Sequence, residues 1–203
     1  MSCIASFENA VFARTGRILQ ISFPEKVLLI SASPTEGGRG DKILGAAQRG
    51  AASAGAETSA VYLRDCSLSP CLACDGCAED GVCVQDDDMK NILAAMHDAD
   101  AVLFAVPVYY NYMAAQAVIL LDRLYCTCRY GDYKLGKEKK VCVFLTCEGS
   151  EKALLKRQID DIMDLGSIRR SVSEYKTEVF RACEDDFGAF LESAEKIGEW
   201  AAE

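Results

Sequence analysis

The chain has 203 residues, of which 50% are hydrophobic and 26% charged, and its formal net charge is −9. This is the composition of an ordinary globular domain, long enough to build a full core. Because no basic stripe is available to track a phosphate backbone, we expect no nucleic-acid partner.

The first 25 residues have no clear period and no export signal, because a basic start, an apolar run and a small-residue cleavage site are missing. We treat residues 1–25 as an N-terminal extension. A short strand, or an arm over a neighbouring subunit, is suggested by Ile18, Leu19, Ile21 and Phe23.

The longest apolar stretch runs from Ala101 to Leu121. It contains Pro107, Asn111 and Gln116, so it predicts a buried strand, a loop and a helix rather than a membrane span. We therefore expect a cytoplasmic protein with no membrane partner.

From residue 26 onward, apolar strands alternate with amphipathic helices. The predicted strands are Lys26–Ser31, Thr58–Leu63, Ala101–Val106, Lys140–Thr146 and Thr177–Phe180. The predicted helices are Asp41–Ala54, a helix capped by Asp86, Asp87 and Asp88, Met113–Cys126, one through Leu155, Ile159, Ile162 and Met163, and one from Phe187 to Ile197. This alternation predicts one α/β domain over 26–203, with a cysteine-rich insert at 66–86.

The domain is predicted to be flavodoxin-like, with a doubly wound five-stranded parallel sheet in the order 2-1-3-4-5 and helices on both faces. Ligands of such sheets bind beyond the carboxyl ends of the strands, at the switch point between strands 1 and 3. The loops after those two strands are therefore the first places to look for a site.

The loop after the first strand is rich in small and hydroxyl residues. Backbone N–H groups and the following helix N-terminus can bind a phosphate there. Neither the nucleoside-triphosphatase loop nor the dinucleotide GxGxxG spacing is present, which favours a mononucleotide. A simple strand-to-helix turn is the alternative. The candidate phosphate ligands are Ser33, Thr35, Gly38, Arg39, Gly40 and Asp41.

The loop after the third strand carries three tyrosines in four residues, a suitable wall for a flat ring. Ordinary core aromatics are the alternative. The candidate residues are Pro107, Val108, Tyr109, Tyr110, Asn111, Tyr112 and Met113, and at the end of the fourth strand Thr146 and Cys147.

Four of the eleven cysteines lie within thirteen residues, as CxxCxxCx5C at Cys71, Cys74, Cys77 and Cys83. The spacing resembles the ferredoxin run that holds a 4Fe–4S cluster. A four-cysteine zinc site usually has two separated CxxC pairs, so zinc fits less well, and unmetallated thiols are the third possibility.

The remaining cysteines have plainer interpretations. Cys66 precedes the cluster and is expected to be incidental, whereas Cys126, Cys128, Cys142 and Cys147 are expected to be small buried hydrophobes. The single histidine, His97, is expected at the surface or end of a helix.

Taken together, the chain from about Lys26 to Leu145 resembles the iron–sulfur flavoprotein branch of the NADPH-dependent FMN reductase family. The matching segments are Ser33-Pro34, Leu63-Arg64-Asp65, the cysteine run with Val84 and Asp86-Asp87-Asp88-Met89, Pro107-Val108-Tyr109, Ala115-Gln116 and Asp122-Arg123. The chain departs from the family pattern at Arg39-Gly40, where relatives often have Asn followed by Ser, Thr or Cys, and at Glu148, which is unusual beside a flavin.

The resemblance implies FMN in the two loops, a 4Fe–4S cluster on the four cysteines, and a homodimer or homotetramer with the cluster of one subunit near a flavin. The expected function is an FMN-binding oxidoreductase that exchanges electrons with a small molecule or protein, with NAD(P)H as a possible co-substrate. One alternative is a cluster-free NAD(P)H-dependent FMN, quinone or azo reductase. The other is a non-catalytic electron carrier that docks on a partner protein.

Overall fold

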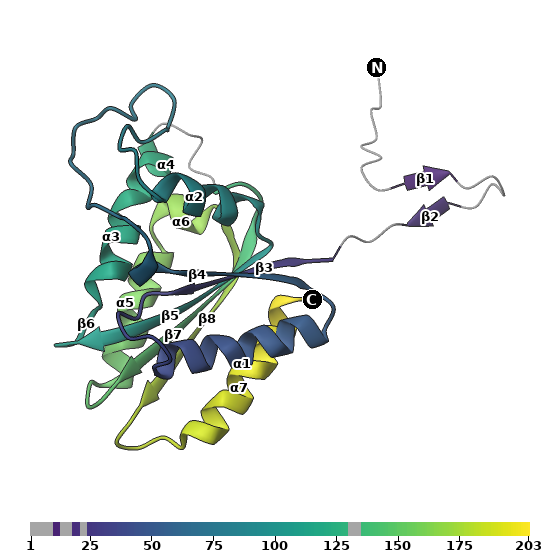
Figure 1. The fold of residues 1–203 in the computed structure, drawn as a ribbon, viewed down its shortest axis with the longest axis vertical. Helices are drawn as coiled ribbons and strands as arrows, with labels where there is room; N and C mark the ends of the chain where they lie inside the picture. The colour runs from purple at the N-terminus through teal and green to yellow at the C-terminus, as the bar shows by residue number, and fades with distance from the viewer. Residues whose placement is uncertain (1–9, 13–17, 21–23, 130–134) are drawn as a thin grey trace.

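The computed structural model describes residues 10–12, 18–20, 24–129 and 135–203 (Figure 1). Near the N-terminus, β1 (Ala10–Phe12) and β2 (Ile18–Gln20) pair antiparallel in a sheet of their own. Ile21 and Phe23 lie outside the described residues. The division into an extension and a domain over 26–203 stays a prediction.

Five parallel strands of the main sheet have the order β4-β3-β5-β7-β8, which is the predicted 2-1-3-4-5 arrangement. They are β3 (Lys26–Ser31), β4 (Glu57–Tyr62), β5 (Ala101–Tyr109), β7 (Lys139–Cys147) and β8 (Val172–Arg181). The sheet has six strands rather than the predicted five, because the short β6 (Tyr112–Met113) pairs with β5. The edge strand β8 begins five residues before its predicted start. Its first half is polar and partly exposed, so it lacks the unbroken apolar run from which a buried strand is predicted.

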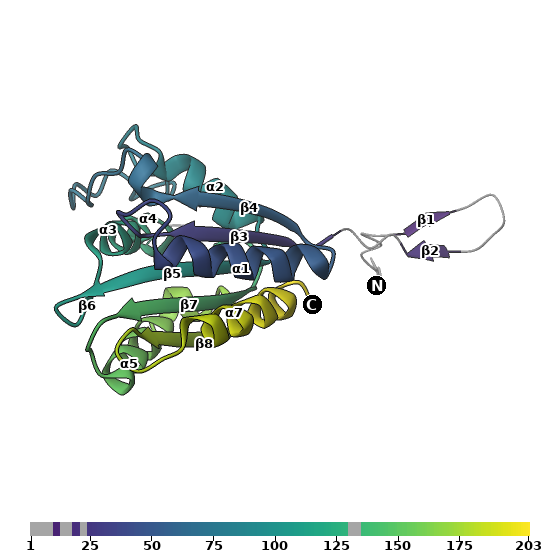
Figure 2. The same ribbon diagram turned by 60° about the horizontal axis from the view of Figure 1, so that its bottom comes forward.

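Helices cover both faces of the sheet (Figures 1 and 2). One face carries α1 (Arg39–Ser53) and α7 (Phe187–Ala201), and the other carries α2 (Met89–Asp98), α3 (Ala115–Arg123), α4 (Tyr125–Arg129), α5 (Lys152–Met163) and α6 (Gly166–Arg169). A short 3-10 helix, Leu63–Asp65, follows β4. Each face packs its own apolar core against the strands.

Helices α1 and α7 lie side by side because small residues let their backbones meet (Figure 2). A Cβ on Gly50 would lie 1.9 Å from the Glu195 carbonyl oxygen, and a Cβ on Gly198 would lie 1.9 Å from that of Ala47. Any larger side chain at either glycine must push the two helices apart.

The structure differs from the predictions at the elements that border the expected site. Helix α1 begins at Arg39 rather than Asp41, and the predicted helix 113–126 is two helices, α3 and α4. The expected aromatic loop is instead a hairpin, since β5 continues to Tyr109 and pairs antiparallel with β6 (Tyr112–Met113). Ala101 to Leu121 is thus a strand, a hairpin and a helix, and no helix in the described part of the chain could cross a membrane.

Candidate functional site

A cleft of about 570 Å³ opens at the carboxyl ends of β3, β5 and β7. Its volume lies within the usual range of small-molecule sites. Twelve of the predicted cofactor residues line it together: Ser33, Thr35, Gly38, Arg39, Gly40, Pro107, Val108, Tyr109, Tyr110, Asn111, Thr146 and Cys147. Glu148, Gly149 and Ser150 complete the lining, although none was a predicted ligand.

The three other predicted residues do not line this cleft. Asp41 lies behind the loop that follows β3, Tyr112 is exposed, and Met113 lines an apolar cavity beneath the sheet. Contact of any of the fifteen residues with a cofactor stays a prediction.

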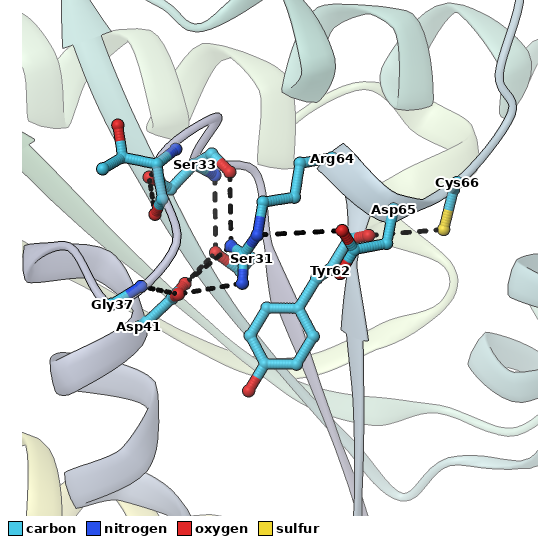
Figure 3. Close-up of polar contacts among 9 residues, drawn as sticks. Ser31, Ser33, Gly37, Asp41, Tyr62, Arg64, Asp65 and Cys66 are labelled. Atoms are coloured by element: carbon cyan, nitrogen blue, oxygen red, sulfur yellow. Dashed lines mark hydrogen bonds and ion pairs between the residues drawn. The ribbon is translucent and has the colours of Figure 1, made fainter.

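The loop after β3 is held in shape from behind by Asp41 (Figure 3). The Asp41 carboxylate accepts hydrogen bonds from Ser31 Oγ at 2.8 Å and from the backbone N–H of Gly37 at 2.8 Å. Arg64 donates to both carboxylate oxygens, at 3.1 and 3.0 Å. Gly37 has a φ of +65°, a backbone conformation that favours glycine. The loop and the N-terminus of α1 are thus preset to bind an anion.

Burial by itself raises the pKa of Asp41, but the hydrogen bonds from Arg64 and Ser31 outweigh it and hold that pKa below its ordinary value. Asp41 therefore stays ionised at neutral pH. Its charge is already matched by Arg64, so the carboxylate supports the loop without facing the cleft.

An ion pair crosses the mouth of the cleft. Arg39, in the first turn of α1, lies 2.5 Å from Glu148, in the loop after β7 (Nη1 to Oε1). The Arg39 guanidinium also lies 5.7 Å from the centroid of the Phe180 ring. Both charged side chains are well exposed, so the pair can exchange partners at little cost.

The second wall of the cleft is the β5–β6 hairpin. Its turn residues, Tyr110 and Asn111, have φ values of +52° and +66°, as a two-residue turn of type I′ requires. Tyrosine is uncommon in that conformation, so the turn stores strain. Gln158 of α5 donates to the Asn111 carbonyl oxygen at 3.0 Å and supports the turn.

The tyrosines of this hairpin point outward. Tyr110 is 98% exposed, Tyr112 is 71% exposed and Tyr109 is half-exposed. An aromatic wall this open can still receive a flat ring from solvent.

The four predicted metal ligands line one small hollow of about 20 Å³ in the insert. Arg123, Tyr125 and Cys126 also line it. Cys66 is not part of it and donates instead to the Tyr62 carbonyl oxygen at 3.4 Å. Among the described residues, no three or more His, Cys, Asp or Glu side chains are arranged to hold a single metal ion.

The backbone of the cysteine run contains two non-glycine residues with positive φ. Ala73 and Asp75 have φ values of +51° and +54°, and the N–H of Ala73 donates to Cys71 Sγ at 3.5 Å. Residues in this conformation can turn neighbouring N–H groups toward one point and form a concave anion site, as at many iron–sulfur centres. Gly76 packs so tightly that a Cβ there would lie 2.6 Å from Val84 Cγ1.

The aspartates predicted to cap α2 mainly serve the insert. Asp88 accepts from the N–H of Ser67 at 2.6 Å, and Asp87 accepts from the N–H groups of Ser69 and Met89. Asp87 also pairs with the buried Arg123 at the end of α3. These contacts hold together the two ends of the insert, which we call its neck.

The other cysteines have the predicted burial where the structure describes them. Cys126, Cys142 and Cys147 are buried, and burial raises the pKa of the Cys126 thiol to about 11. The Cys128 side chain lies outside the described part of the chain. His97 is exposed in the last turn of α2, as predicted.

Sequence reasoning did not assign Arg64 or Arg123 to the site, and it named Glu148 only as an unusual residue beside a flavin. The arginines lie in Leu63-Arg64-Asp65 and Asp122-Arg123, which carry the family resemblance, so a signal was present. Their partners are distant in sequence, 23 residues for Arg64 and Asp41 and 36 for Arg123 and Asp87. Spacing alone therefore does not reveal the pairing.

The model of one protein family, NADPH-dependent FMN reductase, matches residues 25–171. An iron-sulfur flavoprotein of Methanosarcina thermophila is 35% identical over 139 residues, which are 68% of this chain and 71% of that protein. An iron-sulfur flavoprotein of Methanocaldococcus jannaschii is 38% identical over 98 residues, 48% of this chain and 51% of that protein.

Solved structures agree on the fold. An NAD(P)H:quinone oxidoreductase from Methanothermobacter marburgensis superposes with a TM-score of 0.68 at 19% identity, over 87% of this chain and 98% of that one. An azoreductase from Bacillus anthracis gives 0.68 at 18%, over 87% and 99%. With its sheet, its family match and its curated relatives in accord, the chain belongs to the NADPH-dependent FMN reductase family, in the iron–sulfur flavoprotein branch, and is an FMN-binding oxidoreductase.

Proposed function

We propose that the cleft binds FMN with its phosphate on residues 33–40 and its ring against the β5–β6 hairpin, and that the four-cysteine insert carries a 4Fe–4S cluster. The observation that carries the FMN placement is the meeting of two independently predicted loops in one cleft. A helix N-terminus, a glycine with positive φ and Arg39 supply the charge and backbone that a phosphate needs.

The cluster is supported by the convergence of the four thiols on one hollow, by the positive φ values of Ala73 and Asp75 and by a buried guanidinium beside Cys83. When bound, FMN supplies one- and two-electron chemistry, and a 4Fe–4S cluster supplies one-electron transfer. The chain's own residues position these groups. Asp41 and Arg64 fix the phosphate loop, and Gln158 steadies the turn that faces the ring.

The electron donor and acceptor must reach the cleft from its open side, which suits NAD(P)H, a small substrate or the tip of a partner protein. Several large apolar side chains are exposed around the insert and hairpin: Leu72, Val82, Val84, Tyr110 and Tyr112. Such a surface favours burial against another subunit, so the protein assembles as a homodimer or homotetramer. A cytoplasmic location remains a prediction.

The test is cofactor analysis of the protein purified without oxygen. We expect about one FMN per chain, together with about four irons and four acid-labile sulfides. Flavin without iron, with rapid NAD(P)H oxidation, would identify a cluster-free reductase instead. Flavin that NAD(P)H fails to reduce but reduced ferredoxin reduces would identify an electron carrier. A chain that binds no FMN would overturn the proposed site.

A further inference from the structure

Arg123 is a buried cation in direct contact with one of the four cysteines. Its side chain is 1% exposed, at the end of α3 beneath the insert. Nη2 donates to Cys83 Sγ at 3.3 Å and to Asp87 Oδ1 at 3.0 Å, while Nη1 donates to Asp87 Oδ2 at 2.5 Å and to the Ser69 carbonyl oxygen at 2.8 Å. The guanidinium fork thus joins the carboxylate, the insert backbone and one thiol.

A structural brace alone does not account for this arrangement. Burying a guanidinium has a large desolvation cost, which a single carboxylate offsets only in part. The Arg123 Nε is also buried and has no hydrogen-bond partner among the described residues. The contacts with Ser69 and Asp87 use both N–H groups of Nη1 and one of the two on Nη2, and the second N–H of Nη2 is left to donate to Cys83 Sγ.

We propose that Arg123 sets the reduction potential of the cluster, through its charge and through the hydrogen bond that it donates to Cys83. This inference rests on the proposed cluster. Cys83 would then differ from the other three ligands, because it alone contacts a guanidinium among the contacts that the structure describes.

The physical reason is electrostatic. Reduction of a 4Fe–4S centre adds one electron, and therefore one negative charge, to a site already surrounded by four thiolates. A cation 3.3 Å from one sulfur, in a poorly solvated place, stabilises that added charge. Arg123 stays protonated throughout, since its side chain does not titrate at physiological pH, so no proton needs to accompany the electron.

Asp87 allows the direction of the shift in reduction potential to be tested. Its carboxylate lies against the same guanidinium and partly cancels the positive charge felt at Cys83. Removing the Arg123 charge should lower the potential, whereas removing the Asp87 charge should raise it. Mere loosening of the insert would move both variants in the same direction.

The experiment compares Arg123→Met, Arg123→Lys and Asp87→Asn, each purified and reconstituted without oxygen. Dithionite supplies the electron, and electron paramagnetic resonance follows the midpoint potential of the cluster. We expect a shift to more negative potential for Arg123→Met and a smaller shift in the same direction for Arg123→Lys, which keeps the charge but not the fork. Asp87→Asn should shift it to more positive potential.

Two control variants alter charge without touching these contacts, namely Arg157→Met on the exposed face of α5 and Asp86→Asn, exposed beside Asp87. Both should keep the wild-type potential. If Arg123→Met fails to fold, the lysine and asparagine variants still decide the sign. Iron-loaded Arg123 and Asp87 variants that keep the wild-type potential, or that shift it in the same direction, would overturn the role of Arg123 but not the proposed cluster. A wild-type chain that takes up no iron would overturn the cluster itself and this inference with it.

Discussion

The cleft and the cysteine insert lie at the same edge of the sheet but are held by different means. The walls of the cleft continue β3, β5 and β7 or begin α1, so the main sheet and its core fix their positions. The insert, residues 66–86, has no regular strand or helix and depends on Asp87, Asp88 and Arg123 to close its neck. Changes in the insert should therefore leave the cleft intact, whereas changes in the core should damage both.

The largest expected effect is the loss of iron when all four of Cys71, Cys74, Cys77 and Cys83 are changed to serine. We expect iron content to fall to near zero while FMN binding stays within about twofold, because no insert residue lines the cleft. Metal analysis and fluorescence titration with FMN measure the two outcomes. Cys66→Ser is the matched control and should keep its iron. A four-serine variant that still binds iron would show that the ligands lie elsewhere.

Substitutions at two glycines should distinguish the stability of the main fold from the stability of the insert. Gly50→Ala places a Cβ 1.9 Å from the backbone of α7, and the forced separation of helices should destabilise the protein by about 2 kcal/mol or more. Gly76→Ala places a Cβ 2.6 Å from Val84 Cγ1 and 3.5 Å from Cys74 Sγ, both within the insert, so it should reduce iron loading with little change in global stability. Thermal unfolding and iron content together check both. Equal loss of stability in the two variants would contradict the independence of the insert.

Arg64→Met tests the support of the phosphate loop. It leaves the largely buried Asp41 carboxylate without its ion pair, so we expect a loss of about 2 kcal/mol in stability and about a tenfold weaker FMN affinity. The cluster should be unaffected. An unchanged FMN affinity would mean that the loop keeps its shape without Arg64.

Acid titration of unfolding gives a second measure of this contact. Because the folded pKa of Asp41 is lowered, its stabilising contribution is present above the pKa of an unfolded aspartate, about 4. It is lost as the pH falls through the lower, folded value. Asp41→Asn should be less stable than wild type at neutral pH and should show a shallower loss of stability on acidification.

The smallest expected effects concern the Arg39–Glu148 pair at the mouth of the cleft. Arg39→Met should weaken FMN about five- to tenfold, through the loss of a charge-assisted contact to phosphate, and should leave riboflavin binding nearly unchanged. Glu148→Gln frees Arg39 and removes a negative charge near the phosphate, so FMN should bind about twofold tighter. Parallel titrations with FMN and riboflavin make the comparison. Equal effects on both ligands would place the phosphate away from Arg39.

Much of this architecture follows from the sequence. The unbroken apolar strands such as Lys26–Ser31 and the helical stripes between them predicted the parallel sheet and its order, because period and alternation are local properties. The same reasoning placed twelve of fifteen candidate residues in one cleft. It predicted a loop at the aromatic segment, where the structure has a hairpin. The positive φ values of Tyr110 and Asn111 that form its turn are not predicted by the local sequence.

What only the tertiary structure decided are the contacts between distant segments. The pairing of Arg64 with Asp41, of Arg39 with Glu148 and of Arg123 with Asp87 and Cys83 joins residues from 23 to 109 positions apart. The sequence by itself determined which chemical groups the chain has and at which edge of the sheet they gather. Which arginine meets which carboxylate or thiol depends on how helices and loops pack around that edge, and no local pattern records it.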